Sequence, residues 1–284
     1  MKIQEVIFYE DMEDQQGVFE CTCQLTDMTD DTATADFILR RDNRTWAIIR
    51  GWQNARLEID EPLWKVSMSP LHNRLSEEIA PGIFLFRNAY QRVVSWDFIM
   101  KRYFNQAEKA SLRAMLPNKR KERIISRVAV KDAIRALLKQ EKQEAYYPIE
   151  FEIRNDESGQ PFPEGAMTQD IHISIAHKDK EAVGIARSGR PAGIDIELIA
   201  EKTDGFIGLA FHPEELALLP AADHTAWIIR CWVAKEAYGK YIGKGLQGNP
   251  KKYKIDSISG EKLRIGDITV QTIKHNNYII GWTL

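Results

Sequence analysis

Three carboxylates in the second half of the chain have the types and spacing of a divalent-metal site. Asp195 and Glu197 are two residues apart in the strand-like stretch 193–197, so their side chains project from the same face. Glu236 lies in the middle of a predicted helix, in a basic and aromatic context. Magnesium binds through a small number of carboxylates and completes its shell with water and phosphate oxygens. An Asp-x-Glu pair alone is common in strands, but with Glu236 it predicts a metal that holds a pyrophosphate.

The predicted helix that carries Glu236 also carries two lysines. Lys240 follows Glu236 by four residues and therefore shares its face, while Lys235 directly precedes it. Such a pair is most often a surface ion pair worth about 0.2–0.5 kcal/mol. Here it lies near Trp232 and is followed by the glycine-rich stretch 243–248, which does not have the spacing of a P-loop.

Positive charge is concentrated in one predicted helix. Residues 117–142 contain nine cations and three acids, a net charge of +6, whereas the whole chain carries −2. Arg123, Arg127, Lys131 and Arg135 recur at four-residue intervals, and like charges so spaced repel one another. The segment is therefore either a solvent-exposed face or the place where an anion binds.

The apolar pattern predicts an α+β protein. A β-rich beginning is followed by helices and then by a mixture of both, with a domain boundary near residues 80–95. Asn105 and Glu108 have the spacing of a capping box at the start of the first helix. Strands are expected within 17–59 and at 83–86, 93–98, 149–153, 171–177, 182–186, 193–197, 265–273 and 278–282, and helices at 105–115, 119–142, 214–219 and 226–241.

Composition excludes several classes of protein. The chain has 284 residues, of which 44% are hydrophobic and 28% charged, as in an ordinary globular protein. No apolar run approaches the ~20 residues that a membrane crossing needs, and the first residues do not form a signal peptide. Cys21, Cys23 and Cys231 provide neither a disulfide framework nor zinc-knuckle spacing. We expect a cytoplasmic protein with reduced thiols that binds neither nucleic acid nor membrane.

Four short motifs, in order, resemble the phosphopantetheinyl transferase superfamily of the Sfp type. They are Ser-Ile-Ala-His at 174–177, Gly-Ile-Asp-Ile-Glu at 193–197, Trp-x-x-Lys-Glu-Ala-x-x-Lys at 232–240 and Gly-Lys-Gly-Leu at 243–246. The resemblance extends from about residue 105 to the end of the sequence. Two departures from the family pattern are Ala176, which replaces a frequent serine, and Gln160, which replaces a frequent lysine.

The resemblance implies transfer of the 4'-phosphopantetheine arm of coenzyme A to a serine of an acyl or peptidyl carrier protein, with Mg²⁺ as cofactor and 3',5'-ADP as the leaving group. It implies that Glu236 takes the serine proton and that Lys240 steadies the departing phosphate. The metal ligands that it implies are Asp195, Glu197 and Glu236. The coenzyme A phosphates are expected at Arg135, His177, Lys235 and Lys240, with Lys119 and Arg123 near the 3'-phosphate. His177 by itself would be interpreted as a structural histidine.

The family fold implies a pseudo-dimer of two α+β halves with the active site between them. We expect the halves at 96–190 and 191–284, in a monomer with an internal pseudo-twofold axis. Residues 1–95 form an additional β-rich segment, and the stretches 46–52 and 60–64 resemble the end of a hot-dog dehydratase domain of polyketide synthases. Because this segment contains several tryptophans, we expect it to pack as a β layer on the transferase body.

Two other classes of function remain as alternatives. One is a catalytically weak module that keeps the fold in order to bind a carrier protein, and the intact set of three carboxylates argues against it. The other is a nucleic-acid binder that uses the basic helix. The net acidity and the lack of aromatic residues among the cations argue against the second alternative.

Overall fold

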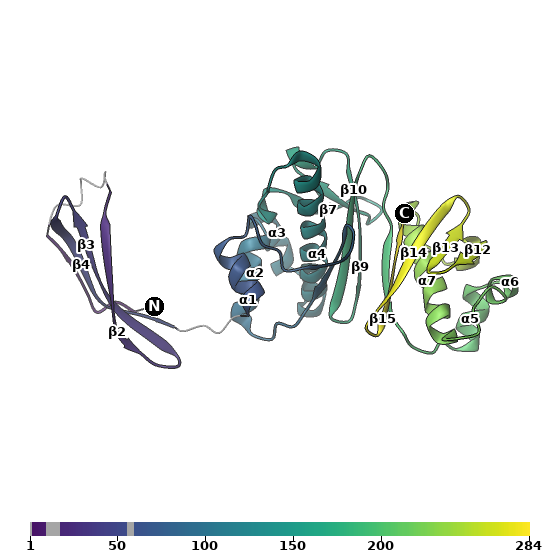
Figure 1. Cartoon of the computed structure of the whole chain (residues 1–284), viewed down its shortest axis with the longest axis horizontal. Coiled ribbons are helices and arrows are strands. Elements are labelled where there is room, and N and C mark those ends of the chain that lie inside the picture. Colours follow the sequence, from purple (N-terminus) through teal and green to yellow (C-terminus); the bar gives the residue numbers. More distant parts are fainter. Residues whose placement is uncertain (1, 10–17, 56–59) are drawn as a thin grey trace. The chain divides into compact units, whose positions relative to one another are not determined.

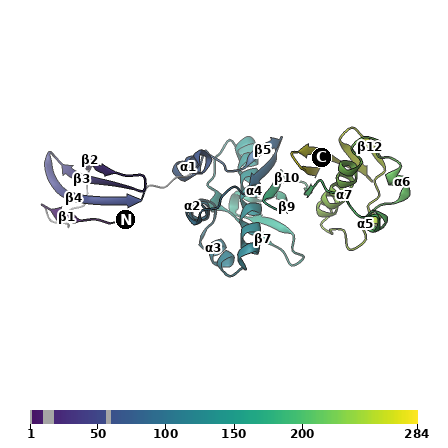
Figure 2. The same cartoon turned by 90° about the horizontal axis from the view of Figure 1, so that it is seen from below.

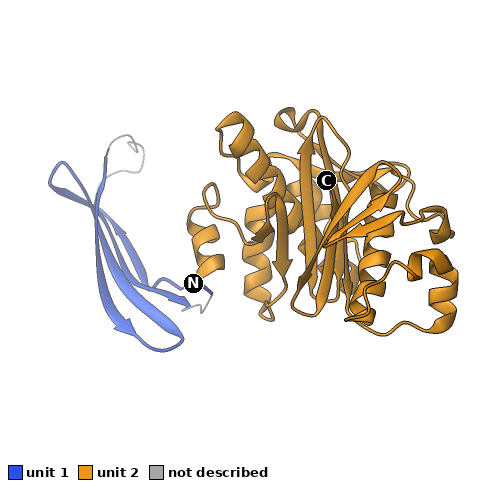
Figure 3. Cartoon of the chain, turned by 45° about the vertical axis from the view of Figure 1, so that its right-hand side comes forward, with its two compact units in different colours: residues 1–60 blue, residues 61–284 orange. Residues whose placement is uncertain are grey.

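The computed structural model describes residues 2–9, 18–55 and 60–284, which Figure 1 shows coloured along the sequence. The chain forms two compact units, residues 1–60 and residues 61–284 (Figure 3). Helices and antiparallel sheets together make an α+β protein, as the sequence predicts. The second unit begins at residue 61, so the stretch 61–95 belongs to the same unit as the predicted transferase halves. None of the described helices is long and apolar enough to cross a membrane.

The first unit is a four-stranded antiparallel sheet. Its strands are β1 (Glu5–Phe8), β2 (Glu20–Met28), β3 (Thr32–Arg41) and β4 (Arg44–Ala55), in the order β1-β4-β3-β2. Aromatic rings pack within the unit: Trp46 contacts Phe8 and Phe19, and Trp52 contacts Phe37. The strands that the sequence predicts here are confirmed within the described residues, and the docking of this segment on the transferase body stays a prediction.

The second unit begins with three helices and a sheet that the long basic helix covers. The sheet order is β5-β6-β10-β9, and α4 packs across it through Val130, Ile134 and Leu138 against Phe84 and Ile173 (Figure 1). The elements are α1 (Glu61–Met68), β5 (Glu77–Ala80), β6 (Ile83–Arg87), α2 (Val93–Tyr103), α3 (Gln106–Arg113), α4 (Pro117–Lys142), η1 (Pro148–Glu150), β7 (Glu152–Asn155), β8 (Pro161–Glu164), η2 (Ala166–Thr168), β9 (Ile171–Lys178) and β10 (Glu181–Ser188).

Two sequence predictions fail in this region. The stretch 93–98, which was expected to be a strand, is the first part of helix α2. The buried residues of α2, Ser95, Ile99 and Tyr103, recur every four residues, and the last two lie beyond the predicted strand. The stretch 149–153 begins as the 3-10 turn η1, because Pro148 is fixed in the helical conformation at its first position. The capping box of α3 is confirmed: the Asn105 side chain accepts from the backbone N–H of Glu108, and Glu108 accepts from that of Asn105.

A second sheet, covered by α7, completes the unit. The sheet order is β11-β15-β14-β13-β12, all antiparallel. The elements are β11 (Ile194–Leu198), α5 (Asp204–Ala210), α6 (Pro213–Leu216), α7 (His224–Tyr241), η3 (Pro250–Lys252), β12 (Ser257–Ser259), β13 (Lys262–Ile265), β14 (Ile268–His275) and β15 (Tyr278–Thr283). Most elements predicted after residue 170 are thereby confirmed, with boundaries shifted by a few residues.

An apolar layer joins the two sheets of the second unit. Ile83 and Val183 from the first sheet pack against Ile194 and Trp282 from the second. The sheets meet where β9 and β10 lie beside β11. In both cartoon views β9 and β10 lie between α4 and the C-terminal part of the chain (Figures 1 and 2). Ser174, from the Ser-Ile-Ala-His motif, accepts a hydrogen bond from the backbone N–H of Ile194 at 3.1 Å. The motif serine therefore ties β9 to the strand that carries Asp195.

The order of elements around the two sheets is the same. Strand β6 is followed by α2, α3, α4, η1 and β7 to β10, and strand β11 is followed by α5, α6, α7, η3 and β12 to β15, with only η2 added in the first series. In both series the first strand pairs with the last, β6 with β10 and β11 with β15.

Each of the two series contains a buried lysine in the same kind of network. Lys131 of α4 lies 2.7 Å from Glu108 and donates to the carbonyls of Tyr103, Pro148 and Phe151. The other network, around Lys235 of α7, has a 2.8 Å ion pair with Glu215 and hydrogen bonds to the carbonyls of Ala210 and Pro250. Burial lowers the pKa of Lys131 to about 8 despite the carboxylate of Glu108. The charge of Lys131 on the basic helix is therefore compensated within the protein.

Candidate active site

The candidate site forms where β11 touches the end of α7. A Cβ atom at Gly193 would lie 2.0 Å from the carbonyl oxygen of Ala237 and 2.8 Å from the backbone nitrogen of Tyr241. Only a residue without a side chain allows this approach. The glycine of the Gly-Ile-Asp-Ile-Glu motif therefore sets the distance between the carboxylates of β11 and the side chains of α7.

The closest contact across this junction joins Lys240 to Asp195. Lys240 Nζ lies 2.8 Å from Asp195 Oδ1 and also donates to the carbonyls of Ile194 and Ile175, at 3.0 and 3.3 Å. The i,i+4 pairing with Glu236 that the sequence favours is replaced by this contact. Burial raises the pKa of Asp195, while Lys240 opposes the rise and Glu197 adds to it.

The second carboxylate of β11 is paired with lysines as well. Lys178 Nζ lies 2.7 Å from Glu197 Oε1, and Lys202 Nζ lies 3.8 Å from the same atom. The hydrogen bond to Glu197 raises the pKa of Lys178. The sequence analysis missed Lys178, although its position directly after His177 at the end of a predicted strand was a usable signal.

Glu236 is the unpaired carboxylate of the set. It is half-buried and makes no hydrogen bond or ion pair with the described residues. Burial, followed by the charge of Asp195, raises its pKa to about 7, with Lys240 opposing and Glu197 adding a smaller rise. A carboxylate with a pKa near neutrality can accept a proton at the pH of the cell.

The three carboxylates fit a hard divalent cation in chemistry, although they do not form a ready-made cluster. Within residues 2–9, 18–55 and 60–284, no group of three or more His, Cys, Asp or Glu side chains is arranged to hold a metal ion. Lysines pair with Asp195 and Glu197, whereas burial, followed by the charge of Asp195, keeps the pKa of Glu236 raised. Carboxylate oxygens are the protein donors that magnesium prefers.

A cavity of about 410 Å³ lies beside His177 at the start of α4. Its lining includes Lys119, Arg123 and His177, three residues that the family resemblance implies for coenzyme A. Glu122 lies between two of them, 3.1 Å from Lys119 Nζ and 3.6 Å from His177 Nε2. The structure therefore brings these three predicted residues together.

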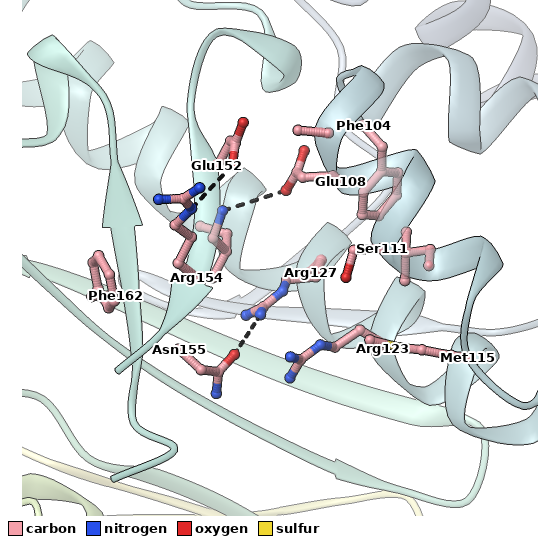
Figure 4. A pocket seen from close by; sticks show the side chains of 13 residues that line it. Phe104, Glu108, Ser111, Met115, Arg123, Arg127, Glu152, Arg154, Asn155 and Phe162 are labelled. Atoms are coloured by element: carbon pink, nitrogen blue, oxygen red, sulfur yellow. Dashed lines mark hydrogen bonds and ion pairs between the residues drawn. The ribbon is translucent and has the colours of Figure 1, made fainter. Parts of the chain in front are cut away.

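An adjoining cavity of about 440 Å³, shown in Figure 4, contains two neighbouring arginines. Arg127 donates to Asn155 Oδ1 at 2.7 Å, and Arg123 lies beside it without a hydrogen bond to any described residue (Figure 4). Burial, and then the charge of Arg123, lowers the pKa of Arg127 to about 9. Two repelling guanidinium groups on one wall favour an anion. Arg127 was counted in the basic run but was not predicted as a site residue.

A third cavity of about 590 Å³ reaches Lys240. Its lining includes the glycine-rich stretch 243–245 and Gln160, the residue that departs from the family pattern. The cavity beside His177 shares Arg123 and Arg127 with the cavity of Figure 4. It shares Ile175 with the cavity that reaches Lys240. Together they form a path along the surface from the arginines of α4 past His177 to Lys240.

Two predicted phosphate-binding residues lie away from this path. Arg135 is buried, and its guanidinium makes five hydrogen bonds, to Asp132 and to the carbonyls of Tyr146, Asn73, Pro70 and Leu71. Lys235 is fully buried beside Glu215, 5.0 Å from the centre of the Phe211 ring. In this structure both side chains hold the fold together, because their donors are already used.

Comparison with known families identifies the part of the chain that carries the carboxylates. Residues 191–282 match the 4'-phosphopantetheinyl transferase superfamily. The match contains Asp195, Glu197, Glu236 and Lys240, and it confirms over these residues the resemblance that the motifs indicate. A comparison with curated proteins gives no match. The superfamily domain indicates transfer of phosphopantetheine as the general chemistry.

Proposed function

We propose that the protein transfers the 4'-phosphopantetheine arm of coenzyme A to a serine of an acyl or peptidyl carrier protein, with Mg²⁺, and releases 3',5'-ADP. One observation carries the proposal. The cationic path from Arg127 ends at Lys240, which lies 2.8 Å from Asp195, an acidic residue of the superfamily domain. Coenzyme A is a long ligand with a 3'-phosphate at one end of its nucleotide and a pyrophosphate at the other. It suits such a path because each of the three cavities is lined by cations that a phosphate can contact.

In this proposal the chain orients coenzyme A by its charges. Arg123, Arg127 and Lys119 bind the nucleotide end, and His177 and Lys240 bind nearer to the pyrophosphate. Asp195, Glu197 and Glu236 would hold the magnesium ion, which would neutralise the charge that develops on the pyrophosphate. A lysine that leaves a carboxylate for a phosphate oxygen keeps its positive charge paired, so Lys240 and Lys178 can change partners without becoming isolated.

Glu236 is proposed as the general base. The serine oxygen attacks the phosphorus atom next to the pantetheine, the bond from that phosphorus to the bridging oxygen breaks, and 3',5'-ADP leaves. Glu236 accepts the serine proton, directly or through water, and a pKa of about 7 leaves a large share of it ionised at neutral pH. Lys240 is proposed to steady the negative charge on the leaving phosphate.

We further propose that the two series of elements are the halves of a pseudo-dimer with one active site. The register supports it: Asp195 lies opposite Gly281, and Phe84 lies opposite Gly184 at the matching place of the first sheet. By the same register Phe86 matches Glu197, and by the buried lysines Asp132 matches Glu236.

The first half accordingly has no second set of free carboxylates. Two of its matching positions are the apolar residues Phe84 and Phe86. The third, Asp132, accepts hydrogen bonds from Tyr103, Arg135 and the backbone N–H groups of Leu75 and Ser76. Its charge is therefore used within the fold, and the chemistry is confined to β11 and α7.

The experiment that tests the function is the mass of an apo carrier protein after incubation with the chain, coenzyme A and magnesium. The expected result is a gain of one phosphopantetheine arm, which disappears when a chelator removes the metal. Arg127→Met should weaken coenzyme A binding by about tenfold or more, since one charge-assisted contact to phosphate is lost. Arg264→Met, at an exposed cation of β13, is the matched control.

The outcomes separate the proposal from its main alternative. Stable binding of the carrier protein without any gain in mass would favour the catalytically weak binding module. Equal coenzyme A affinity in Arg127→Met and the unmodified chain would remove the arginines from the proposed path.

A further inference from the structure

A second groove lies on the side of α3 and α4 that faces away from the coenzyme A path. It has a volume of about 520 Å³ and is bounded by α2, α3 and the first turns of α4. Ile124 is buried at its floor, Trp96 and Met100 are half-buried on its walls, and Val93 at its edge is 77% exposed. The groove is thus apolar inside and open to solvent.

The rim of this groove is strongly positive. Four cations line it without a hydrogen bond or ion pair to any described residue, namely Lys101, Lys109, Arg113 and Lys121. Asp97 is the one acid among the lining residues. Arg120 also lines the groove, and its guanidinium donates to the carbonyls at the end of α3, which fixes α3 on α4. Among the described residues, Arg120 has no carboxylate partner either.

We propose that this groove is the docking site for an acidic amphipathic helix of a partner protein. Charge complementarity indicates this kind of partner. A helix with glutamates or aspartates beside an apolar stripe would pair with the free cations and cover Trp96 and Met100 at the same time. A flat anionic membrane would reach the rim but not the recessed Ile124. A nucleic acid would place charged phosphates against the apolar interior of the groove, where Trp96 is the aromatic ring among the lining residues on which a base could stack.

The docking site is separate from the proposed transfer reaction. On α3, Lys109 and Arg113 line this groove, whereas Ser111 and Leu112 line the cavity of Figure 4. On α4 the same division separates Lys121 from Arg123, which lies on the coenzyme A side. The occupant therefore does not deliver the acceptor serine, and the inference does not depend on the proposed function.

The test uses the full chain and a fluorescein-labelled synthetic helix of 18 residues, with leucines spaced to form one stripe and glutamates elsewhere. A peptide of the same composition with the leucines scattered is the matched control probe. Binding is followed by fluorescence anisotropy. The double variant Lys109→Glu with Arg113→Glu should weaken binding of the striped peptide at least tenfold, and Trp96→Ala should weaken it as well. Lys262→Glu, at an exposed lysine of β13, should leave it unchanged.

The charge variants are at the surface, so circular dichroism and the melting temperature should match those of the unmodified chain. Saturating coenzyme A should leave the peptide affinity unchanged. Equal binding of the two peptides, or equal binding by the charge-reversed variant, would overturn the proposal. It would also be overturned if vesicles containing phosphatidylglycerol bind through these residues while the striped peptide does not, because the surface would then be a membrane contact.

Discussion

Lys240 Nζ lies 2.8 Å from Asp195 Oδ1, and this contact joins the end of α7 to the start of β11. The same lysine also donates to two backbone carbonyls, of Ile194 and Ile175, so it has partners on both β11 and β9. One side chain thus connects the three elements that surround the proposed transfer site.

Replacing Asp195 should remove activity and leave the fold. Asp195→Asn keeps the size of the side chain, and Lys240 retains its carbonyl partners, so the melting temperature should change by only a few degrees. The rate of transfer should fall on the order of 100-fold or more, because a metal-binding and charge-stabilising group is lost. Asp267→Asn, at a fully exposed aspartate, is the control. Undiminished magnesium-dependent transfer by Asp195→Asn would remove this residue from the site.

The raised pKa of Glu236 predicts how rate and stability depend on pH. Magnesium bound beside Glu236 should lower its pKa below the metal-free value of about 7, so the rate of transfer should rise with pH at a midpoint below 7, since the ionised form accepts the serine proton. For stability the sign is opposite: the folded pKa lies above the ordinary value of 4.5, so the folded state holds the proton more tightly. The metal-free protein should therefore lose roughly 1–2 kcal/mol between pH 4.5 and 8, after allowance for solvent screening.

Glu236→Gln tests this assignment, because it cannot ionise. The difference in free energy of unfolding between the variant and the unmodified chain should shift in favour of the variant as pH rises through this range. The measurement is chemical denaturation at several pH values without metal. A difference that stays constant with pH would show that Glu236 has an ordinary pKa.

Gly193 should tolerate no side chain. Gly193→Ala places a Cβ atom 2.0 Å from the carbonyl oxygen of Ala237, so β11 and α7 must separate at a cost of about 1–3 kcal/mol or more. Transfer should fall together with stability, since Asp195 moves relative to Lys240. Gly208→Ala in α5 is the matched control, because a Cβ atom there meets no other atom within 4 Å. If Gly193→Ala and Gly208→Ala leave stability and transfer equally unchanged, the close contact between Gly193 and Ala237 is contradicted.

Lys235 and Lys240 should have separable roles. Lys235→Met leaves Glu215 as an unpaired buried charge and should destabilise the protein by about 3–5 kcal/mol. The double change Lys235→Met with Glu215→Leu should recover part of that loss, because no buried charge remains, although the backbone N–H groups of His212 and Ile255 lose their acceptor. Lys240→Met should cause a large loss of transfer and a smaller loss of stability than Lys235→Met, because the pair of Lys240 and Asp195 is partly exposed to solvent. If Lys235→Met is stable but fails to bind coenzyme A, Lys235 is a phosphate ligand as the family resemblance implies.

The hydrogen-bond partners of Asp132 and Arg135 predict how many N-terminal residues can be removed without loss of the fold. Arg135 donates to carbonyls of Pro70, Leu71 and Asn73, and Asp132 accepts from residues 75 and 76. A chain that begins at residue 61 keeps these partners and should fold and transfer. A chain that begins at residue 83 lacks five of the hydrogen bonds made by these two buried charged side chains, so it should be insoluble or unfolded. The two proteins can be compared by circular dichroism and by the transfer assay.

Local patterns were sufficient for much of the fold. The pair Asn105 and Glu108 predicts the start of α3 because a capping box involves neighbours only. The strand expected at 93–98 failed because a β-branched, aromatic beginning hides a helix whose buried face becomes visible only with Ile99 and Tyr103. Periodicity over a few residues does not distinguish the two.

The candidate site was predictable where the chemistry resides in one motif. The structure brings Asp195 of β11 and Lys240 together, although the sequence favours a pairing of Lys240 with Glu236. Arg135 and Lys235 were assigned to phosphate binding from their positions in the sequence. Their burial depends on residues distant in the sequence, namely the loop after α1 for Arg135 and Glu215 of α6 for Lys235. Lys178 was missed because its partner, Glu197, lies on a different strand.

The two buried lysine networks have a consequence for how the sequence can change over time. Lys131 with Glu108 and Lys235 with Glu215 maintain the scaffold of each series of elements by equivalent bonds. The residues that differ between the series, Phe84 against Asp195 among them, lie outside these networks. In the proposed pseudo-dimer, mutational tolerance is therefore separated from catalysis: one half can have apolar residues where the other retains acidic ones, and neither arrangement disturbs the ion pair that anchors its long helix.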